Sequence, residues 1–329
     1  MSNLDGKRIL VTGGTGSFGK KLIDILLKEY QPEKLIVFSR DELKQFEMSQ
    51  VFPEEKYPPL RYFIGDVRDK DRLYRAFYGV DYVIHAAALK QVPACERNPF
   101  EAIQTNVIGA ENIINAAIDC GIKKVMALST DKAANPVNLY GATKLCSDKL
   151  FVAGNSYAGW KETRFSVVRY GNVIGSRGSV IPYFKKMRET GAIPITDTRM
   201  TRFWITLEQG VRFVLKCLEV AQGGELFVPK IPSMKLVDLA HAIAPGCRHE
   251  IIGIRPGEKI HEVLVTEDDG RHTLEFDNYF IIEPEFHWWS AKAHISNGGK
   301  PVKEGFLYAS HLNEEWVTKE ELQKLIEED

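Results

Sequence analysis

The feature that most constrains this chain is a glycine-rich segment that directly follows a short apolar run. Residues 8–12 read RILVT, and Gly13, Gly16 and Gly19 then form a G-x-x-G-x-x-G pattern. A helical pattern of apolar residues extends from Phe18 to Leu26. Glycines permit a tight turn and a close approach of the backbone to a pyrophosphate, which rests on the helix N-terminus. The segment predicts a strand, turn and helix that bind a dinucleotide.

Apolar runs of strand length recur through the first half of the chain and alternate with helix-sized stretches. The further runs are residues 35–38, 62–64, 82–84, 124–128 and 165–169, and the clearest helical stretches are residues 100–119 and 138–153. Continuous apolar strands separated by helices indicate a parallel sheet covered on both faces. With right-handed crossovers, the pattern predicts an α/β fold, a Rossmann-type doubly wound parallel sheet.

The pattern becomes less regular after residue 171, where Gly and Pro are more frequent and the strands are shorter. We therefore expect two parts, a dinucleotide-binding domain over residues 1–171 and a smaller C-terminal substrate lobe over residues 172–329. The chain is expected to cross back from the second part to the first.

Charge and composition exclude several classes of protein. The chain has 43 Lys and Arg against 44 Asp and Glu, a net charge of −1, which is not typical of a nucleic-acid-binding protein. No apolar run approaches the roughly 20 residues of a membrane span, and the N-terminus shows no secretory pattern. Five scattered cysteines without C-x-x-C indicate reduced thiols in the cytoplasm, and the histidines show no metal-ligand spacing.

The end of the second strand bears on the choice of dinucleotide. Ser39 and Arg40 stand at this strand end, with Lys44 one helical turn further on. NAD enzymes usually place an acidic residue here for the ribose 2′-OH, whereas Ser and Arg suit a 2′-phosphate, so the sequence favours NADP. In the alternative reading Arg40 is a solvated surface charge and Asp41 contacts the ribose.

The next two strand ends carry further candidate residues. Asp66 and Val67 follow the third strand, where folds of this type place an adenine contact. Alternatively, Asp66 caps a helix over residues 69–78. His85 closes the fourth strand, and we expect it to be structural, beside the cofactor.

The fifth strand brings Thr130, Asp131 and Lys132 to the edge where doubly wound sheets bind their ligands. Tyr140 and Lys144 follow at a spacing of four, which places both on one face of a helix. A lysine ammonium beside a tyrosine favours the phenolate, which can act as a general base. Lys144 is also placed to hold the nicotinamide ribose.

These motifs resemble the extended short-chain dehydrogenase/reductase superfamily and, within it, the inverting UDP-N-acetylglucosamine 4,6-dehydratases, which make the first intermediate of pseudaminic acid. The likeness extends from about residue 7 to the C-terminus. The segments that carry it are residues 13–19, 39–44, 85–90, 129–144, 168–173, 200–204 and 255–259.

Two positions favour the inverting type. Retaining relatives follow the threonine with Asp-Glu, whereas this chain has Asp131 and Lys132. Long membrane-anchored relatives carry Met where this chain has Tyr140. In the alternative reading of Asp131 and Lys132, the two form an exposed loop ion pair.

The resemblance implies a reaction in three stages. Tyr140 removes the 4-OH proton while C4 is oxidised, and Thr130 hydrogen-bonds the same oxygen. Lys132, as a neutral amine, takes the C5 proton, and Asp131, as a protonated acid, helps the 6-OH leave as water. Hydride return to C6 and protonation of C5 from the opposite face then give UDP-2-acetamido-2,6-dideoxy-β-L-arabino-hex-4-ulose. Lys132 needs a lowered pKa and Asp131 a raised one.

The resemblance also implies two sets of binding residues and a homo-oligomer, a dimer or a hexamer. NADP is expected to stay bound and to be regenerated in each turnover. The cofactor set is Gly13, Thr15, Gly16, Ser17, Phe18, Gly19, Ser39, Arg40, Asp41, Glu42, Lys44, Asp66, Val67, Ala86, Ala87, Lys90, Tyr140, Lys144 and Val173. The UDP-N-acetylglucosamine set is Lys90, Asn172, Val180, Thr196, Arg199, Arg202, Arg255 and Glu258, of which Arg199 has the alternative of a solvated surface residue.

Other functions fit parts of the same pattern. A UDP-sugar 4-epimerase or a retaining dehydratase uses a similar site, and the 5,6-ene intermediate could be released before hydride return. A redox-sensing NADP-binding regulator with a silent site belongs to another class. Such a regulator need not keep Thr130, Asp131, Lys132, Tyr140 and Lys144 together, and all five are present.

Overall fold

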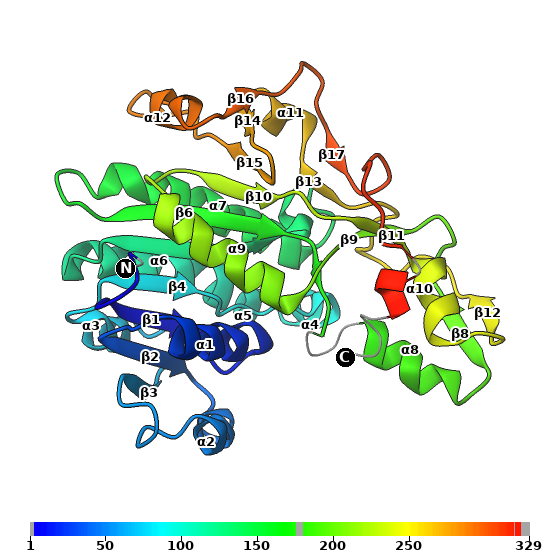
Figure 1. Cartoon of the computed structure of the whole chain (residues 1–329), viewed down its shortest axis with the longest axis horizontal. Helices are drawn as coiled ribbons and strands as arrows, with labels where there is room; N and C mark the ends of the chain where they lie inside the picture. Colours follow the sequence, from blue (N-terminus) through cyan, green and yellow to red (C-terminus); the bar gives the residue numbers. More distant parts are fainter. Residues whose placement is uncertain (1–2, 176–179, 319, 324–329) are drawn as a thin grey trace.

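The computed structural model describes residues 3–175, 180–318 and 320–323. Its central element is a ten-stranded sheet with the strand order β16-β14-β15-β10-β6-β5-β4-β1-β2-β3 (Figure 1). The first six strands in the sequence all pair in parallel. These are β1 (Arg8–Thr12), β2 (Lys34–Ser39), β3 (Leu60–Ile64), β4 (Tyr82–His85), β5 (Lys124–Thr130) and β6 (Arg164–Tyr170). The predicted doubly wound α/β fold is confirmed.

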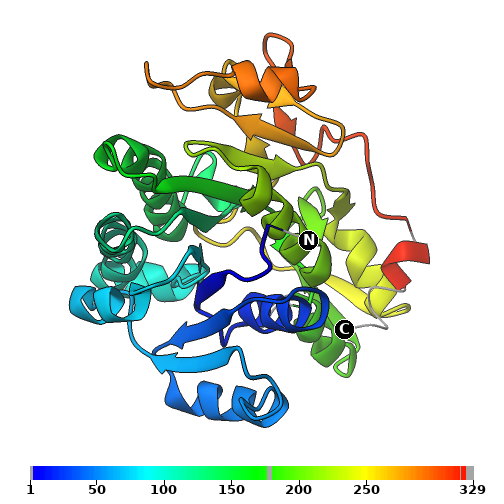
Figure 2. The same cartoon turned by 60° about the vertical axis from the view of Figure 1, so that its left-hand side comes forward.

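Helices cover both faces of the parallel strands, which is why these strands are apolar almost throughout. One face carries α1 (Ser17–Glu29) and α9 (Leu207–Val220), which pack against each other. The other face carries α3 (Lys70–Phe77), α6 (Gly109–Cys120) and α7 (Leu139–Tyr157) (Figure 2). The other helices of this half are α2 (Glu42–Val51), α4 (Val92–Arg97), α5 (Pro99–Ile103) and a π-helical turn at Gln104–Ile108.

The second half of the chain returns to the sheet. Strand β10 (Leu226–Pro229) pairs in parallel with β6, and β15 (Tyr279–Ile282) then adds in antiparallel orientation. Strands β14 (Thr273–Glu275) and β16 (Lys300–Pro301) complete this edge. The large hydrophobic core accordingly includes residues from both halves of the chain.

A second, smaller hydrophobic core belongs entirely to residues after 171. It lies among α8 (Val180–Arg188), α10 (Leu236–Ile243) and the small sheets. The strands of these small sheets are β7 (Asn172–Val173), β8 (Ala192–Ile195), β9 (Thr201–Ile205), β11 (Ser233–Lys235) and β12 (Arg248–Ile251). The remaining elements are β13 (Val263–Val265), β17 (Tyr308–Ala309), α11 (Glu267–Gly270) and α12 (Lys292–Ser296). The predicted domain boundaries at 171 and 172 stay a prediction.

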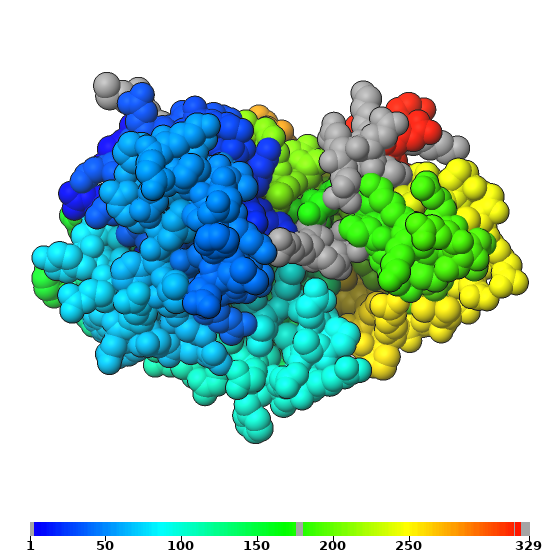
Figure 3. All heavy atoms as spheres, turned by 90° about the horizontal axis from the view of Figure 1, so that it is seen from below, coloured from blue at the N-terminus to red at the C-terminus, as the bar shows by residue number. Residues whose placement is uncertain are grey.

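The two regions meet beyond the carboxyl ends of the parallel strands. From below, the N-terminal residues lie beside α8 and the neighbouring segments of the second half (Figure 3). A ligand at this edge of the sheet is therefore within reach of both regions. Among the described residues, no helix has the length and apolar character needed to cross a lipid bilayer.

His85 at the end of β4 gives a prediction about stability. Its side chain is buried, its Nδ1 lies 2.7 Å from the Thr12 hydroxyl, and burial lowers its pKa to about 3, with a smaller contribution from Lys144. The unfolded chain, with an ordinary histidine pKa of about 6.5, then binds the proton that the folded chain rejects. We expect the free energy of unfolding to fall as the pH drops from about 6.5 toward 3.

Denaturant titrations across this pH range measure the effect. His85→Asn keeps a polar atom near Thr12 but removes the titration, so its slope should be shallower by up to about 1.4 kcal/mol per pH unit. The exposed His287 supplies the control variant His287→Asn, which should keep the native slope. Equal slopes for native protein and His85→Asn would contradict the assignment.

Candidate active site

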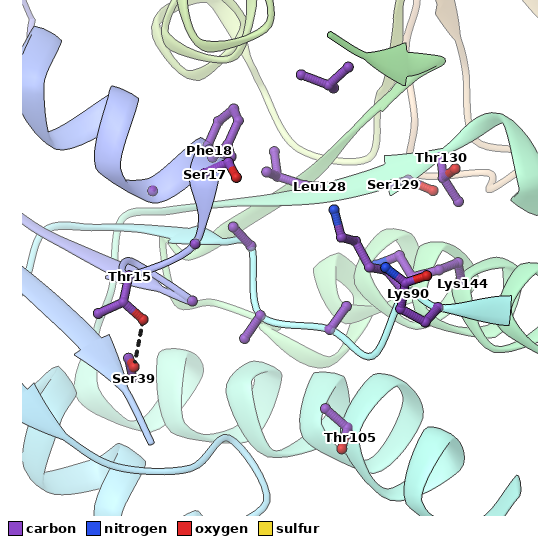
Figure 4. Close-up of a pocket in the computed structure, with 18 of the residues that line it drawn as sticks. Thr15, Ser17, Phe18, Ser39, Lys90, Thr105, Leu128, Ser129, Thr130 and Lys144 are labelled. Atoms are coloured by element: carbon purple, nitrogen blue, oxygen red, sulfur yellow. Dashed lines mark hydrogen bonds between the residues drawn. The ribbon is translucent and has the colours of Figure 1, made fainter. Parts of the chain in front are cut away.

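A cavity of about 700 Å³ lies at the carboxyl edge of the sheet. Its walls come from the segments that follow β1, β2, β3, β4, β5 and β6, together with β7 and the start of α8 (Figure 4). Every predicted cofactor residue except Glu42 lies on the wall, as do Thr130 and Lys132. The wall also includes residues that the sequence did not indicate, among them Gln91, Thr105, Leu128, Tyr170, Trp204 and Leu207.

The glycine-rich turn brings the backbone of β1 against the segment after β4. Gly13 has a φ of +67°, which favours glycine, and a Cβ at this position would lie 2.8 Å from the Ala87 nitrogen. The amide of Gly16 donates to the Gly13 carbonyl at 2.9 Å, and α1 begins directly after it at Ser17. The N-terminus of α1 therefore opens onto the cavity, which suits a pyrophosphate.

The end of β2 is fixed by polar contacts. The hydroxyls of Thr15 and Ser39 are 2.9 Å apart and buried (Figure 4). Asp41 caps α2: its carboxylate accepts from the Lys44 amide at 3.0 Å and pairs with the Lys44 amine at 2.7 Å. These contacts hold the pKa of Asp41 below its usual value. The half-exposed guanidinium of Arg40 remains at the rim, 3.7 Å from Asp66.

Asp66 is not a helix cap. The cap of α3 is Asp69, whose carboxylate accepts from the Arg72 amide at 3.0 Å. Asp66 instead accepts from the Arg68 guanidinium at 2.8 and 3.0 Å, and its pKa is lowered because Arg68 outweighs the effect of burial. The alternative reading of Asp66 was wrong. A cap at Asp66 would require α3 to begin at residue 67, and α3 begins three residues later, at Lys70.

Tyr140 and Lys144 lie on the face of α7 that lines the cavity. The predicted phenolate is not favoured here, because burial raises the pKa of Tyr140 to about 12, while Lys132 and Thr130 act to lower it. The lowering of the Tyr140 pKa that was expected from Lys144 comes instead from Lys132 and Thr130. Burial also lowers the pKa of Lys144, with Asp148 opposing it.

A buried polar network behind Lys144 was missed by sequence reasoning. Asp148, one turn further along α7, accepts from the Ser129 hydroxyl at 2.6 Å and from Arg169 at 3.5 Å. Arg169 also donates to Asp269 at 3.2 Å. Burial raises the pKa of Asp148, and the nearby cations Arg169 and Lys144 oppose that rise. The repeat of polar residues at positions 140, 144 and 148 is the sequence pattern that indicates this face.

Asp131 and Lys132 follow β5 in a single 3₁₀ turn, Asp131–Ala133. The exposed-loop reading is wrong, because the Asp131 side chain is 0% exposed and that of Lys132 is 26% exposed. The Lys132 amine donates to Asp131 Oδ1 at 3.0 Å, and the Thr130 hydroxyl donates to the same oxygen at 2.8 Å. Gly141 allows this turn to pack on α7, since a Cβ there would overlap the Lys132 carbonyl.

The proton affinity of Lys132 also differs from the expectation. Burial acts to lower its pKa, but the carboxylates of Asp131 and Glu262 outweigh burial and raise the pKa above its ordinary value. In this arrangement Lys132 is an ammonium group rather than the neutral amine that the predicted base requires. Asp131 has the larger effect, and Glu262, which is 130 residues distant in sequence and 3.6 Å distant in space, adds to it.

The predicted substrate residues divide into two groups. Lys90, Asn172 and Val180 lie on the cavity wall, and burial lowers the pKa of Lys90. The other five do not line the cavity; they are Thr196, Arg199, Arg202, Arg255 and Glu258. Arg199 is two-thirds exposed and paired with Asp197 at 2.7 Å, as its surface alternative predicted.

Arg202 and the loop after β12 lie behind the wall. Arg202 donates to the backbone carbonyls of Thr201, Lys259 and Ile260 at 2.8–3.0 Å. These bonds hold its guanidinium against the loop. Two further predicted residues, Arg255 and Glu258, lie in the same loop. The Glu258 carboxylate accepts a hydrogen bond from the Arg255 amide. Thr196 is buried and contacts the sulfur of Met200.

Comparison with known proteins agrees with this geometry. The sequence pattern of a family described as polysaccharide biosynthesis protein matches residues 9–284. A UDP-N-acetylglucosamine 4,6-dehydratase (inverting) of Campylobacter jejuni is 58% identical over 328 residues, 97% of each chain. The chain belongs to this polysaccharide biosynthesis family, within the extended short-chain dehydrogenase/reductases.

Members of this family differ in the activities that they are named for. A UDP-glucose 4-epimerase of Rickettsia canadensis is 40% identical over 328 residues, which are 97% of this chain and 95% of that protein. The solved structure of Pen from Bacillus thuringiensis is 39% identical, with a TM-score of 0.90 over 99% of each chain. Family membership therefore establishes the fold. The residues of the site must distinguish a 4,6-dehydratase from a 4-epimerase.

The network behind Lys144 gives the next prediction. Asp148→Ala leaves the buried Lys144 without its nearby carboxylate and Arg169 with Asp269 alone, so we expect a loss of about 3–5 kcal/mol in the free energy of unfolding. Urea denaturation followed by circular dichroism measures it. Ser147→Ala is the matched control, because the neighbouring Ser147 hydroxyl is buried with no hydrogen-bond partner among the described residues. Similar small losses in both variants would contradict a structural role for Asp148.

Proposed function

We propose that this chain is an NADP-dependent lyase, an inverting UDP-N-acetylglucosamine 4,6-dehydratase. The observation that carries the proposal is one arrangement of side chains. Thr130, Lys132 and Tyr140 line one cavity, with Asp131 in direct contact with Lys132. The 58% identity to a protein named for this activity supports it. We further propose that the product enters pseudaminic acid synthesis, in the cytoplasm, and that the enzyme is a homo-oligomer.

The cavity fits a dinucleotide. A Cβ at Gly13 would fill the space between the first turn and the segment after β4, and the amide end of α1 opens onto the same space. Arg40 at the rim suits a 2′-phosphate, and Asp41 is engaged as a helix cap. When bound, the nicotinamide cofactor supplies the hydride acceptor for C4 and later the hydride donor for C6.

At C4, Tyr140 is the group that receives the hydroxyl proton as the alcohol becomes a ketone. Burial opposes the phenolate, and Lys132 and Thr130 favour it. While Lys132 is an ammonium group, it therefore favours the phenolate of Tyr140. Thr130, at the end of β5, is placed to hydrogen-bond the same sugar oxygen.

At C5 and C6, proton transfer within one ion pair produces both required groups. Lys132 and Asp131 are joined by a 3.0 Å hydrogen bond. Transfer of the ammonium proton to the carboxylate gives a neutral amine and a carboxylic acid, and a site closed by substrate favours this neutral pair because it disfavours separated charge. The amine then takes the C5 proton, the acid protonates the departing 6-OH, and water leaves. Hydride return to C6 and protonation of C5 by solvent water on the opposite face then complete the 6-deoxy group and invert C5.

Incubation with UDP-N-acetylglucosamine in D₂O, followed by NMR of the product, tests the proposal. We expect a new 6-methyl resonance, deuterium at C5 and the L-arabino configuration. Tyr140→Phe should lower turnover by about 10²–10⁴-fold. Tyr157→Phe, at the exposed end of the same helix, should leave turnover unchanged.

Other results would contradict the proposal or a part of it. A 4-epimerised sugar without a 6-methyl group would favour the epimerase, the activity named for the Rickettsia relative. A 6-deoxy product with the D configuration at C5 would indicate a retaining dehydratase, and a released alkene would indicate an incomplete reaction. Undiminished solvent exchange at C5 in Lys132→Ala would contradict the role of Lys132.

The choice of NADP gives a separate prediction. Arg40→Ala removes the cation at the cavity rim that faces the ribose side of the dinucleotide, so the affinity for NADP should fall at least about tenfold, or 1.4 kcal/mol. The affinity of the same variant for NAD should change little. Isothermal titration of both dinucleotides measures this difference. Equal losses for the two would contradict a 2′-phosphate contact by Arg40.

A further inference from the structure

Glu262 has a buried carboxylate that takes no direct part in the proposed reaction. It lies in the loop between β12 and β13, and its side chain is only 4% exposed. Its Oε1 is 3.6 Å from the Lys132 amine and 3.8 Å from Arg202 Nε, and its Oε2 is 3.5 Å from the Lys259 amine. Three cations from three separate segments therefore meet at one carboxylate.

The backbone of Glu262 is fixed on both sides. Its amide donates to the Ser310 hydroxyl at 2.9 Å, and its carbonyl accepts from the Ser310 amide at 2.8 Å. The Ser310 hydroxyl also contacts the Thr201 hydroxyl at 2.7 Å. These contacts tie the loop to β9 and β17, so the position of the carboxylate is set by the fold.

Lys259 joins the same cluster to the catalytic turn. Its amine donates to the carbonyl of Ala134 at 2.6 Å and to that of Asp131 at 3.5 Å. With Asp131 and Glu262 ionised, the cluster of two carboxylates and three cations has a net charge of +1. Loss of Glu262 would leave +2 in a largely buried region, which is costly.

We propose that Glu262 is a positioning residue of the reaction: its carboxylate holds the Lys132 amine beside Asp131 and balances the charges of Lys259 and Arg202. The inference rests on the proposed function, because Lys132 matters only if it exchanges the C5 proton. Glu262 stabilises the ammonium form of Lys132 before substrate closes the site. It thereby determines how readily the proton moves from Lys132 to Asp131.

The experiment measures the proton affinity of Lys132 without turnover. The charged or titratable groups that face its amine are Asp131, Tyr140, Arg202, Lys259 and Glu262. At one fixed alkaline pH, trace acetylation by acetic anhydride, read by peptide mass spectrometry, reports the neutral fraction of each lysine. The rate at Lys132 is compared with that at the exposed Lys303 in the same sample.

Glu262→Gln keeps the shape of the side chain and removes the charge. Because an opposite charge at this distance moves a pKa by about 1 unit or more, we expect the relative acetylation of Lys132 to rise at least tenfold. Glu262→Asp retains a carboxylate and should restore a lower rate. In turnover, Glu262→Gln should lower kcat about tenfold or more, with little change in the KM for UDP-N-acetylglucosamine. The reason is that the Lys132 amine is no longer held beside Asp131 and, once neutral, no longer favours the Tyr140 phenolate.

The matched control is Glu225→Gln, which also removes a buried glutamate. Glu225 bonds to Ser166 and His294, toward the opposite end of β6 from the cavity, so its loss should leave the acetylation of Lys132 unchanged. An unchanged rate at Lys132 in Glu262→Gln, or a raised KM with native kcat, would overturn the inference. Native enzyme that gives no 6-deoxy product would instead contradict the proposed function, which the labelling does not depend on.

Discussion

The parallel pairing of β1, β4, β5 and β6 is the constraint on which the rest of this structure depends. Parallel strands end at one edge, so the glycine turn, the segment after β4 and the 3₁₀ turn after β5 are brought together there. Residues that are separated by more than a hundred positions then line one cavity. The second half of the chain completes this site because β10 rejoins the same sheet and β7 follows directly from β6.

Burial at this edge gives the site its chemical character. A dry environment opposes charge on Tyr140 and on Lys144, and each is balanced by a particular neighbour. Lys132 favours the phenolate of Tyr140, and Asp148 favours the ammonium of Lys144. Lys132 differs from both, because two carboxylates outweigh its burial. Proton positions in the site therefore depend on a charge cluster rather than on any single residue.

Much of the fold could be predicted from the apolar runs, because a strand buried on both faces must be apolar along its whole length. The glycine turn and the Tyr140–Lys144 spacing were equally readable, since both rest on local backbone geometry. The choice between Asp66 and Asp69 as the cap of α3 was not readable, because it depends on a shift of three residues in the helix start. The binding of Arg202 to backbone carbonyls was also hidden, because its partners lie near residue 260.

The sequence by itself determined the doubly wound sheet, the position of the glycine-rich turn and the polar residues that follow β5, because each follows from short-range periodicity or from the order of neighbouring residues. Only the tertiary structure decided the charge states that these residues can adopt. Glu262, Lys259 and Arg202 surround Lys132 because the loop before β13 folds back on the 3₁₀ turn after β5. Coulombic effects act through space over a few ångströms, and spacing along the chain has no bearing on their strength.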